Sequence, residues 1–84
     1  MTINMLVIFI VMKKRGLNPE LEVGDKIICY FMEGETSVPP GTTGTVMSID
    51  RDPFEDNGKI ISVKWDNGVN LALISTTDAW KMAN

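Results

Sequence analysis

The sequence has 84 residues and a formal net charge of −3, with no histidine and a single cysteine. This length corresponds to one domain, and a single cysteine excludes an internal disulfide. Without histidine the chain lacks the usual general base near neutral pH and the commonest zinc ligand, so we expect neither an enzyme nor a metal or cofactor site.

The N-terminal segment contains an unbroken apolar run over residues 5–12, followed at once by the basic cluster Lys13, Lys14 and Arg15. A membrane-spanning helix needs about 20 apolar residues, so this run is too short to span a bilayer. A secretory signal peptide carries its positive charges before the apolar run, and here the order is reversed. The run therefore fits neither a membrane span nor a signal peptide.

Three interpretations of this apolar run remain open. It is an extra strand that covers a barrel edge or pairs with another copy in a homo-oligomer, an upstream extension with Met12 as the true start, or a surface membrane anchor. We therefore divide the chain into an extension, residues 1–15, and a domain, residues 16–84.

The first strand of the domain is predicted over residues 26–32, which are rich in β-branched and aromatic side chains. Residues 33–40 cannot continue this strand, because they end in Pro39 and Pro40, which have no backbone N–H to donate. A long loop is expected there, and the next strand is predicted over residues 43–49.

A hairpin follows from two strand-like runs, residues 60–65 and 69–74, on either side of Asp66-Asn67-Gly68. A three-residue loop with Gly68 in the left-handed conformation sorts apolar and polar side chains onto separate faces, whereas a two-residue loop mixes them. The predicted apolar pairs are Trp65 with Val69, Val63 with Leu71 and Ile61 with Leu73.

The remaining elements complete an all-β order. Residues 75–78 predict a short turn of helix, and residues 79–82 a terminal strand. Five short strands with one long early loop favour a small SH3-like five-stranded barrel over the alternative, an oligonucleotide-binding barrel. Cys29 lies inside an apolar strand and is interpreted as a small buried hydrophobe in a reduced cytosol.

The densest polar cluster lies between the second and third predicted strands and contains Asp50, Asp52, Glu55 and Asp56. A calcium loop of the helix-flanked type needs an oxygen ligand and then a glycine, where this chain has Phe54 and Glu55, so we expect a solvated acidic loop and no metal. From residue 16 onward five basic residues face eleven acidic ones, a net charge of −6. This charge therefore disfavours nucleic acid as a partner of the domain.

Three stretches, residues 23–27, 39–46 and 63–68, together resemble a family of short uncharacterised domains from bacteriophages and prophages. The resemblance covers residues 21–82. A looser similarity, confined to residues 44–46 and 63–68, links the chain to SH3-like modules of eukaryotic ubiquitin ligases and of ribosomal and transcription-factor proteins. The resemblance implies an SH3-like barrel and a phage origin, and it transfers no catalytic residue.

The function expected on these grounds is a small phage-encoded module that binds a host or phage protein in the cytoplasm of the infected cell, as an accessory or anti-defence factor. Alternatives are a nucleic-acid or nucleotide binder that uses Lys13, Lys14 and Arg15, and a virion structural subunit. Loops on a rigid barrel commonly carry recognition, so the expected binding surface is a lip formed by residues 33–38 and residues 50–57, with Tyr30 at its edge. Its residues are Tyr30, Glu33, Glu35, Asp50, Asp52, Glu55 and Asp56.

Overall fold

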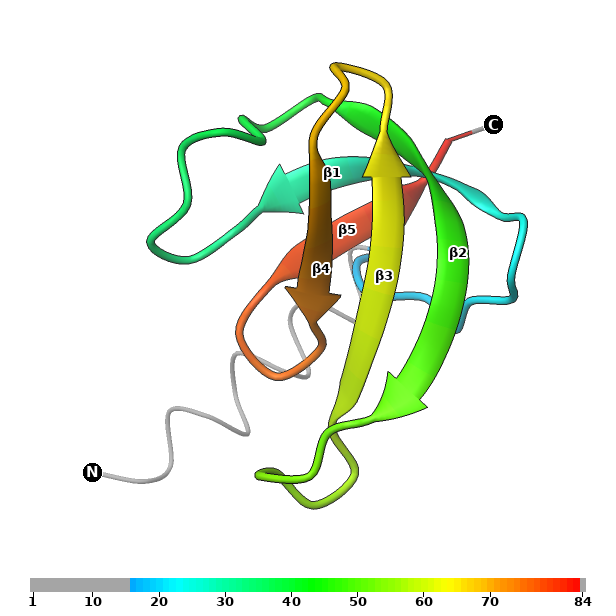
Figure 1. Ribbon diagram of the computed structural model, residues 1–84, viewed down its shortest axis with the longest axis vertical. Helices are drawn as coiled ribbons and strands as arrows, with labels where there is room; N and C mark the ends of the chain where they lie inside the picture. The colour runs from blue at the N-terminus through cyan, green and yellow to red at the C-terminus, as the bar shows by residue number, and fades with distance from the viewer. Residues whose placement is uncertain (1–15, 84) are drawn as a thin grey trace.

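The computed structural model describes residues 16–83, which form one five-stranded antiparallel sheet. The strands are β1 (Lys26–Phe31), β2 (Thr43–Arg51), β3 (Lys59–Trp65), β4 (Asn70–Ile74) and β5 (Ala79–Met82). Their order in the sheet is β4-β3-β2-β1-β5. Figure 1 shows the sheet curling on itself, so that β1 and β5 cross behind β3 and β4. The all-β expectation is confirmed.

The core lies inside this curl and receives buried side chains from every strand. Alternation on β3 directs Ile61, Val63 and Trp65 inward, as the period of a half-buried strand requires. The other buried core residues include Ile27 and Cys29 on β1, Val46 on β2, Leu73 on β4 and Trp80 on β5. The indole N–H of Trp65 donates to the carbonyl of Leu71 at 2.9 Å, so its burial leaves no donor unpaired.

The β3–β4 hairpin has the predicted register. Val63 lies opposite Leu71 and Ile61 opposite Leu73. The N–H of Trp65 donates to the carbonyl of Val69 at 3.0 Å, and Gly68 has φ +91°. The three-residue turn is confirmed, because this positive φ is the conformation that favours glycine.

The helical turn expected over residues 75–78 does not form, and the described residues contain no helix. A hydrogen-bonded turn stands in its place, in which the N–H groups of Thr77 and Asp78 both donate to the carbonyl of Ile74, at 3.0 and 2.9 Å. The turn is too short to propagate a helical ladder before β5 begins at Ala79. No helix among residues 16–83 is long and apolar enough to cross a membrane.

The outer edge of β5 is covered by the segment that leads into the sheet. The N–H of Asn18 donates to the carbonyl of Trp80 at 2.9 Å, and the Trp80 N–H donates to the side-chain oxygen of Asn18 at 3.1 Å. Asn18 adopts a positive φ of 54°, which asparagine tolerates better than most residues. This one residue therefore satisfies edge groups that a further strand would otherwise pair.

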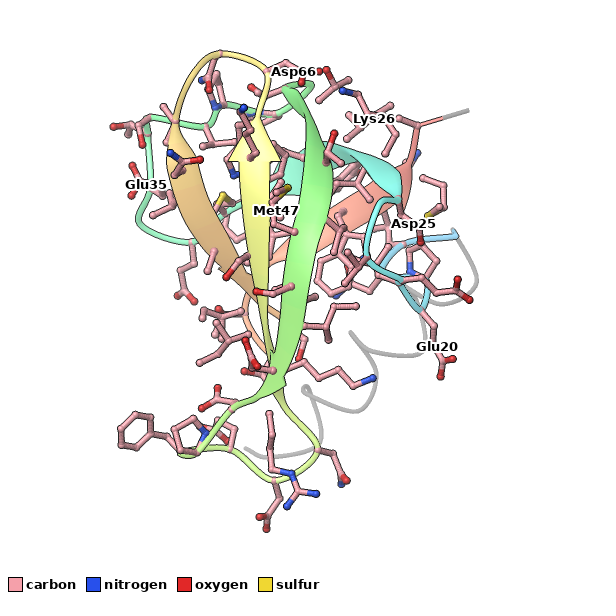
Figure 2. The ribbon with its side chains drawn as sticks, turned by 45° about the vertical axis from the view of Figure 1, so that its right-hand side comes forward. Glu20, Asp25, Lys26, Glu35, Met47 and Asp66 are labelled. Atoms are coloured by element: carbon pink, nitrogen blue, oxygen red, sulfur yellow. The ribbon has the colours of Figure 1, made fainter. Side chains whose placement is uncertain are left out.

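Two β-bulges interrupt the sheet, and each adds one residue. The register shifts between Cys29 and Phe31 on β1 and between Val46 and Ser48 on β2, so Tyr30 and Met47 are the extra residues. A bulge re-aims side chains, and both of these are about half exposed, Tyr30 at 47% and Met47 at 54%. Figure 2 shows Met47 on the central part of β2.

Candidate functional site

The acidic loop, residues 52–58, joins β2 to β3 and is closed by its own hydrogen bonds. The N–H of Asp52 donates to the carbonyl of Gly58 at 3.0 Å, and the N–H of Gly58 donates to the carbonyl of Glu55 at 3.1 Å. The buried Asp52 carboxylate accepts the N–H of Phe54 at 2.9 Å. This pattern is an Asx turn, in which the side chain of aspartate replaces a backbone acceptor.

Two backbone positions further restrict the loop. Asn57 adopts φ +61°, a left-handed conformation that few residues other than glycine and asparagine tolerate. A Cβ atom at Gly58 would lie 3.0 Å from the Cβ of Glu55 and 3.2 Å from the Cβ of Asp52. The residues at these positions therefore suit one loop conformation, which an alanine at Gly58 would disturb.

Phe54 is the most exposed large apolar side chain that the structure describes, with 90% of its surface accessible. The exposed carboxylates of Glu55 and Asp56 follow it directly. Sequence reasoning treated Phe54 only as a mismatch to a calcium loop and missed its exposure. The sequence pattern does indicate this exposure, because Phe54 lies between Pro53 and a run of polar residues, outside the alternation of apolar and polar residues that buries a strand side chain.

The four acidic residues predicted between β2 and β3 differ in exposure: three are exposed and one is buried. Asp50 is exposed on β2, opposite Ile60, while Glu55 and Asp56 are exposed on the loop beside Phe54. Asp52 is only 6% exposed and already holds the loop closed. The exposed carboxylates can meet a partner, whereas Asp52 acts on the loop itself.

The second predicted loop, residues 33–38, is organised by Glu35. Its carboxylate accepts hydrogen bonds from the N–H of Thr36 at 2.9 Å and from the N–H and hydroxyl of Ser37 at 2.8 and 2.7 Å. These bonds, the Ser37 hydroxyl first, hold the pKa of Glu35 below its ordinary value. The carbonyl of Ser37 in turn accepts the side-chain amide of Asn67, so this loop lies against the β3–β4 turn.

The two loops do not form the single lip that the sequence predicted. Residues 33–38 reach the β3–β4 turn at one end of β3, whereas the acidic loop closes at the other end, where Arg51 lies opposite Lys59. Figure 1 shows the acidic loop at one extreme of the molecule, and Figure 2 shows Glu35 well away from it. The acidic loop is therefore considered by itself.

A second exposed apolar surface surrounds the bulge on β1. Tyr30 and Phe31 are 47% and 48% exposed, because the extra residue directs both side chains outward. The ammonium group of Lys81 on β5 lies 5.4 Å from the centre of the Tyr30 ring, within the range of a cation–π contact. Tyr30 therefore belongs to this surface and not to the expected lip.

The sequence matches a protein-family model over most of its length. A domain of unknown function, DUF4314, matches residues 15–83. The chain belongs to this family. Comparison with curated proteins and with solved structures found no match.

The family assignment supplies no activity, so the chemistry open to the DUF4314 domain depends on its side chains. Within residues 16–83, no group of three or more histidine, cysteine or acidic side chains is arranged to hold a metal ion. Cys29 is buried, and this burial, with a smaller contribution from Asp78, raises the pKa of its thiol. The predicted basic cluster, Lys13, Lys14 and Arg15, lies outside the described residues.

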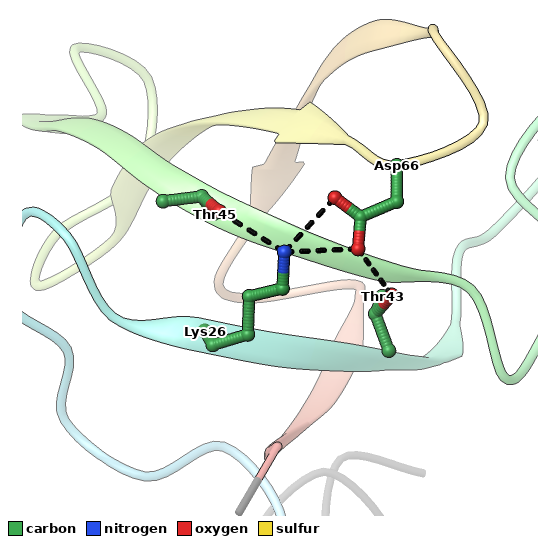
Figure 3. Close-up of polar contacts among 4 residues, drawn as sticks. All are labelled: Lys26, Thr43, Thr45 and Asp66. Atoms are coloured by element: carbon green, nitrogen blue, oxygen red, sulfur yellow. Dashed lines mark hydrogen bonds and ion pairs between the residues drawn. The ribbon is translucent and has the colours of Figure 1, made fainter.

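An exposed polar cluster near the β3–β4 turn has a structural explanation (Figure 3). The ammonium group of Lys26 lies 2.9 Å from the Asp66 carboxylate, which also accepts the hydroxyl of Thr43. The Thr43 hydroxyl, and then Lys26, hold the pKa of Asp66 below its ordinary value. These contacts join β1 and β2 to the β3–β4 turn, so we assign the cluster a structural role.

Proposed function

We propose that this DUF4314 domain is a protein-binding module that uses Phe54 as its anchor. The observation that carries the proposal is the 90% exposure of Phe54 on a loop closed by Asp52 and Gly58. Aromatic side chains dominate the energetics of many protein interfaces, and an ordered loop has less conformational entropy to lose on binding. The loop therefore has the properties of a preorganised contact.

The partner of such a loop has a definable chemistry. A pocket that takes Phe54 is apolar, and its rim carries lysine or arginine to meet Glu55 and Asp56. The same carboxylates repel a phosphate backbone, as does the net charge of −6 from residue 16 onward. These charges favour a protein partner over a nucleic acid.

The proposal extends to the fold type of the domain and to the origin of the chain. We interpret the curled sheet as an SH3-like barrel, supported by the long loop between β1 and β2, the tight β3–β4 turn and the turn before β5. The resemblance described above supports a phage or prophage source. On that basis the module acts in the cytoplasm of the infected cell, as an accessory or anti-defence factor that binds a host or phage protein.

A capture experiment tests the anchor. The full chain, its Phe54→Ala variant and a Val23→Ala control are immobilised and exposed to a host-cell lysate treated with nuclease. Val23 is a suitable control because it is 66% exposed and lies outside the acidic loop. We expect at least one protein to be retained by the parent and by Val23→Ala and lost with Phe54→Ala, as measured by mass spectrometry. Identical sets of captured proteins for all three would contradict the proposal.

A further inference from the structure

The surface around the β1 bulge contains a hollow of about 680 Å³ that is open to solvent. Its lining residues are Ile28, Cys29, Tyr30, Phe31, Pro40, Gly41, Ala79 and Lys81. Cys29 and Ala79 are buried, at 1% and 0% exposure, whereas Tyr30 and Phe31 are about half exposed. The hollow is thus an apolar depression with aromatic sides.

The charge of this hollow is opposite to that of the acidic loop. Lys81 is the only charged residue among those lining it, in a domain whose net charge from residue 16 onward is −6. Phe54 on the acidic loop is followed by Glu55 and Asp56. One surface therefore offers an exposed ring next to carboxylates, and the other offers an apolar depression next to an ammonium group.

Within one copy of the domain, the acidic loop is closed on itself and follows β2, whereas the side of the hollow formed by Pro40 and Gly41 precedes β2. The strand β2 has nine residues. At about 3.3 Å per residue, a straight strand of this length spans roughly 26 Å, which separates Pro40 and Gly41 from the acidic loop. Seating of Phe54 across the hollow, as far as Pro40 and Gly41, therefore requires a second molecule.

We propose that copies of this domain associate head to tail, with Phe54 of one copy seated in the hollow beside Tyr30 and Phe31 of the next. Glu55 and Asp56 then approach Lys81 of the receiving copy. The inference rests on the proposed function, because it names a partner for the same loop. The two contacting surfaces are different, so the contact is heterologous and repeats into rings or filaments. A single seated aromatic buries about 150–250 Å², so the association is weak and concentration-dependent.

Sedimentation velocity on the full chain over a wide concentration range tests this arrangement. We expect the average mass to rise with concentration for the parent and for Val23→Ala. Phe54→Ala and Lys81→Glu are each expected to weaken the association at least about tenfold. Both altered residues are exposed, so melting temperatures close to that of the parent show that the variants remain folded.

Mixing the two variants distinguishes head-to-tail contact from other forms of self-association. Phe54→Ala keeps the hollow, and Lys81→Glu keeps the loop, so each alone is expected to remain monomeric at concentrations where the parent associates. Together they can form one intact contact, which gives a dimer of one copy of each that cannot grow further. A mixture that remains monomeric while the parent associates would overturn the proposal.

Two other outcomes separate the inference from the proposed function. A parent that stays monomeric, while Phe54→Ala loses a captured protein, overturns the head-to-tail inference and leaves the proposed function standing. Self-association that neither Phe54→Ala nor Lys81→Glu weakens also overturns the inference, because another surface then carries it. If Phe54→Ala changes neither self-association nor capture, both proposals fail.

Discussion

The turn at residues 75–78 and the acidic loop at residues 52–58 each depend on one buried aspartate. Asp78 is 5% exposed and Asp52 is 6% exposed. The carboxylate of Asp78 accepts the N–H of Glu33 at 3.1 Å and the N–H of Ile74 at 2.7 Å. It therefore joins the end of β1 to the end of β4. Among residues 16–83, the carboxylate of Asp52 accepts only the N–H of Phe54, two residues away.

This difference separates a residue that holds the fold from one that holds a surface. Loss of Asp78 releases segments that are distant in sequence, so its effect extends over the whole sheet. Loss of Asp52 releases a loop whose strands are paired independently, through seven residue pairs between β2 and β3. Similar burial of a charged side chain thus has different energetic consequences, depending on the sequence separation of its partners.

The largest effect is expected for Asp78→Ala. This substitution leaves the N–H groups of Glu33 and Ile74 without their acceptor, and we expect a loss of about 2–4 kcal/mol in the free energy of unfolding. Urea unfolding followed by fluorescence of the two buried tryptophans measures it. Thr76→Ala, in the same turn but exposed, is the control. If Asp78→Ala lowers the free energy of unfolding by less than about 1 kcal/mol, its effect matches that expected for Asp52→Ala, and the contrast between the two aspartates is wrong.

The β3–β4 turn contains no buried carboxylate and depends instead on the backbone conformation of Gly68. Gly68 has φ +91°, and a Cβ atom there would meet no other atom within 4 Å, so the cost of a side chain arises from the backbone alone. We expect Gly68→Val to destabilise the domain by about 1–2 kcal/mol. Lys64→Ala, on the exposed face of β3, should stay close to the parent. Equal melting temperatures for Gly68→Val and the parent would contradict the turn.

A smaller global effect is expected for Asp52→Ala. One backbone N–H loses its acceptor, so we expect about 0.5–1 kcal/mol of destabilisation. The local effect is larger, because Phe54 is no longer held, and amide exchange at Phe54 should accelerate more than exchange within β3. Hydrogen exchange followed by NMR measures both. Uniform acceleration across the sheet would show that Asp52 holds the fold as Asp78 does.

The smallest effect concerns the exposed carboxylate of Asp66. Its pKa is lowered from the ordinary value of 3.8, so its contribution to stability is present above the pKa of the unfolded chain and is lost as the pH falls through the folded pKa. Asp66→Asn lacks this titration. We therefore expect the difference in melting temperature between parent and Asp66→Asn to shrink in acid. A difference that stays constant from neutral to acidic pH would contradict this role.

The sequence was sufficient for the parts of the fold that depend on local pattern. The register of the β3–β4 hairpin followed from alternation and the Asp66-Asn67-Gly68 turn, because a slip of one residue would expose a whole apolar face. The extension of β2 to Arg51 did not follow, because polar residues at the end of a strand give no periodic signal. The register of distant strands, which brings Arg51 opposite Lys59, decides that boundary.

The candidate site was less predictable, because it depends on contacts between distant segments and on bulges. The bulge at Tyr30 exposes two neighbouring aromatic side chains where strict alternation would bury one. The hydrogen bond from the side-chain amide of Asn67 to the carbonyl of Ser37 holds residues 33–38 against the β3–β4 turn and away from the acidic loop. No local sequence motif predicts this contact. Phe54, by contrast, was recognisable in principle from its polar neighbours.

The contact between Asn18 and Trp80 has a practical consequence for protein engineering. It joins the entry of the chain into the sheet to its last strand, and three residues further along the chain the N–H of Ala83 donates to the carbonyl of Lys26 at 2.9 Å. Both end segments of the described domain are thus bonded to the β1–β5 side of the sheet. Domains with adjacent ends tolerate insertion into a surface loop of a host scaffold. Such a graft would display the acidic loop, at the far end of β2, as a rigid recognition element.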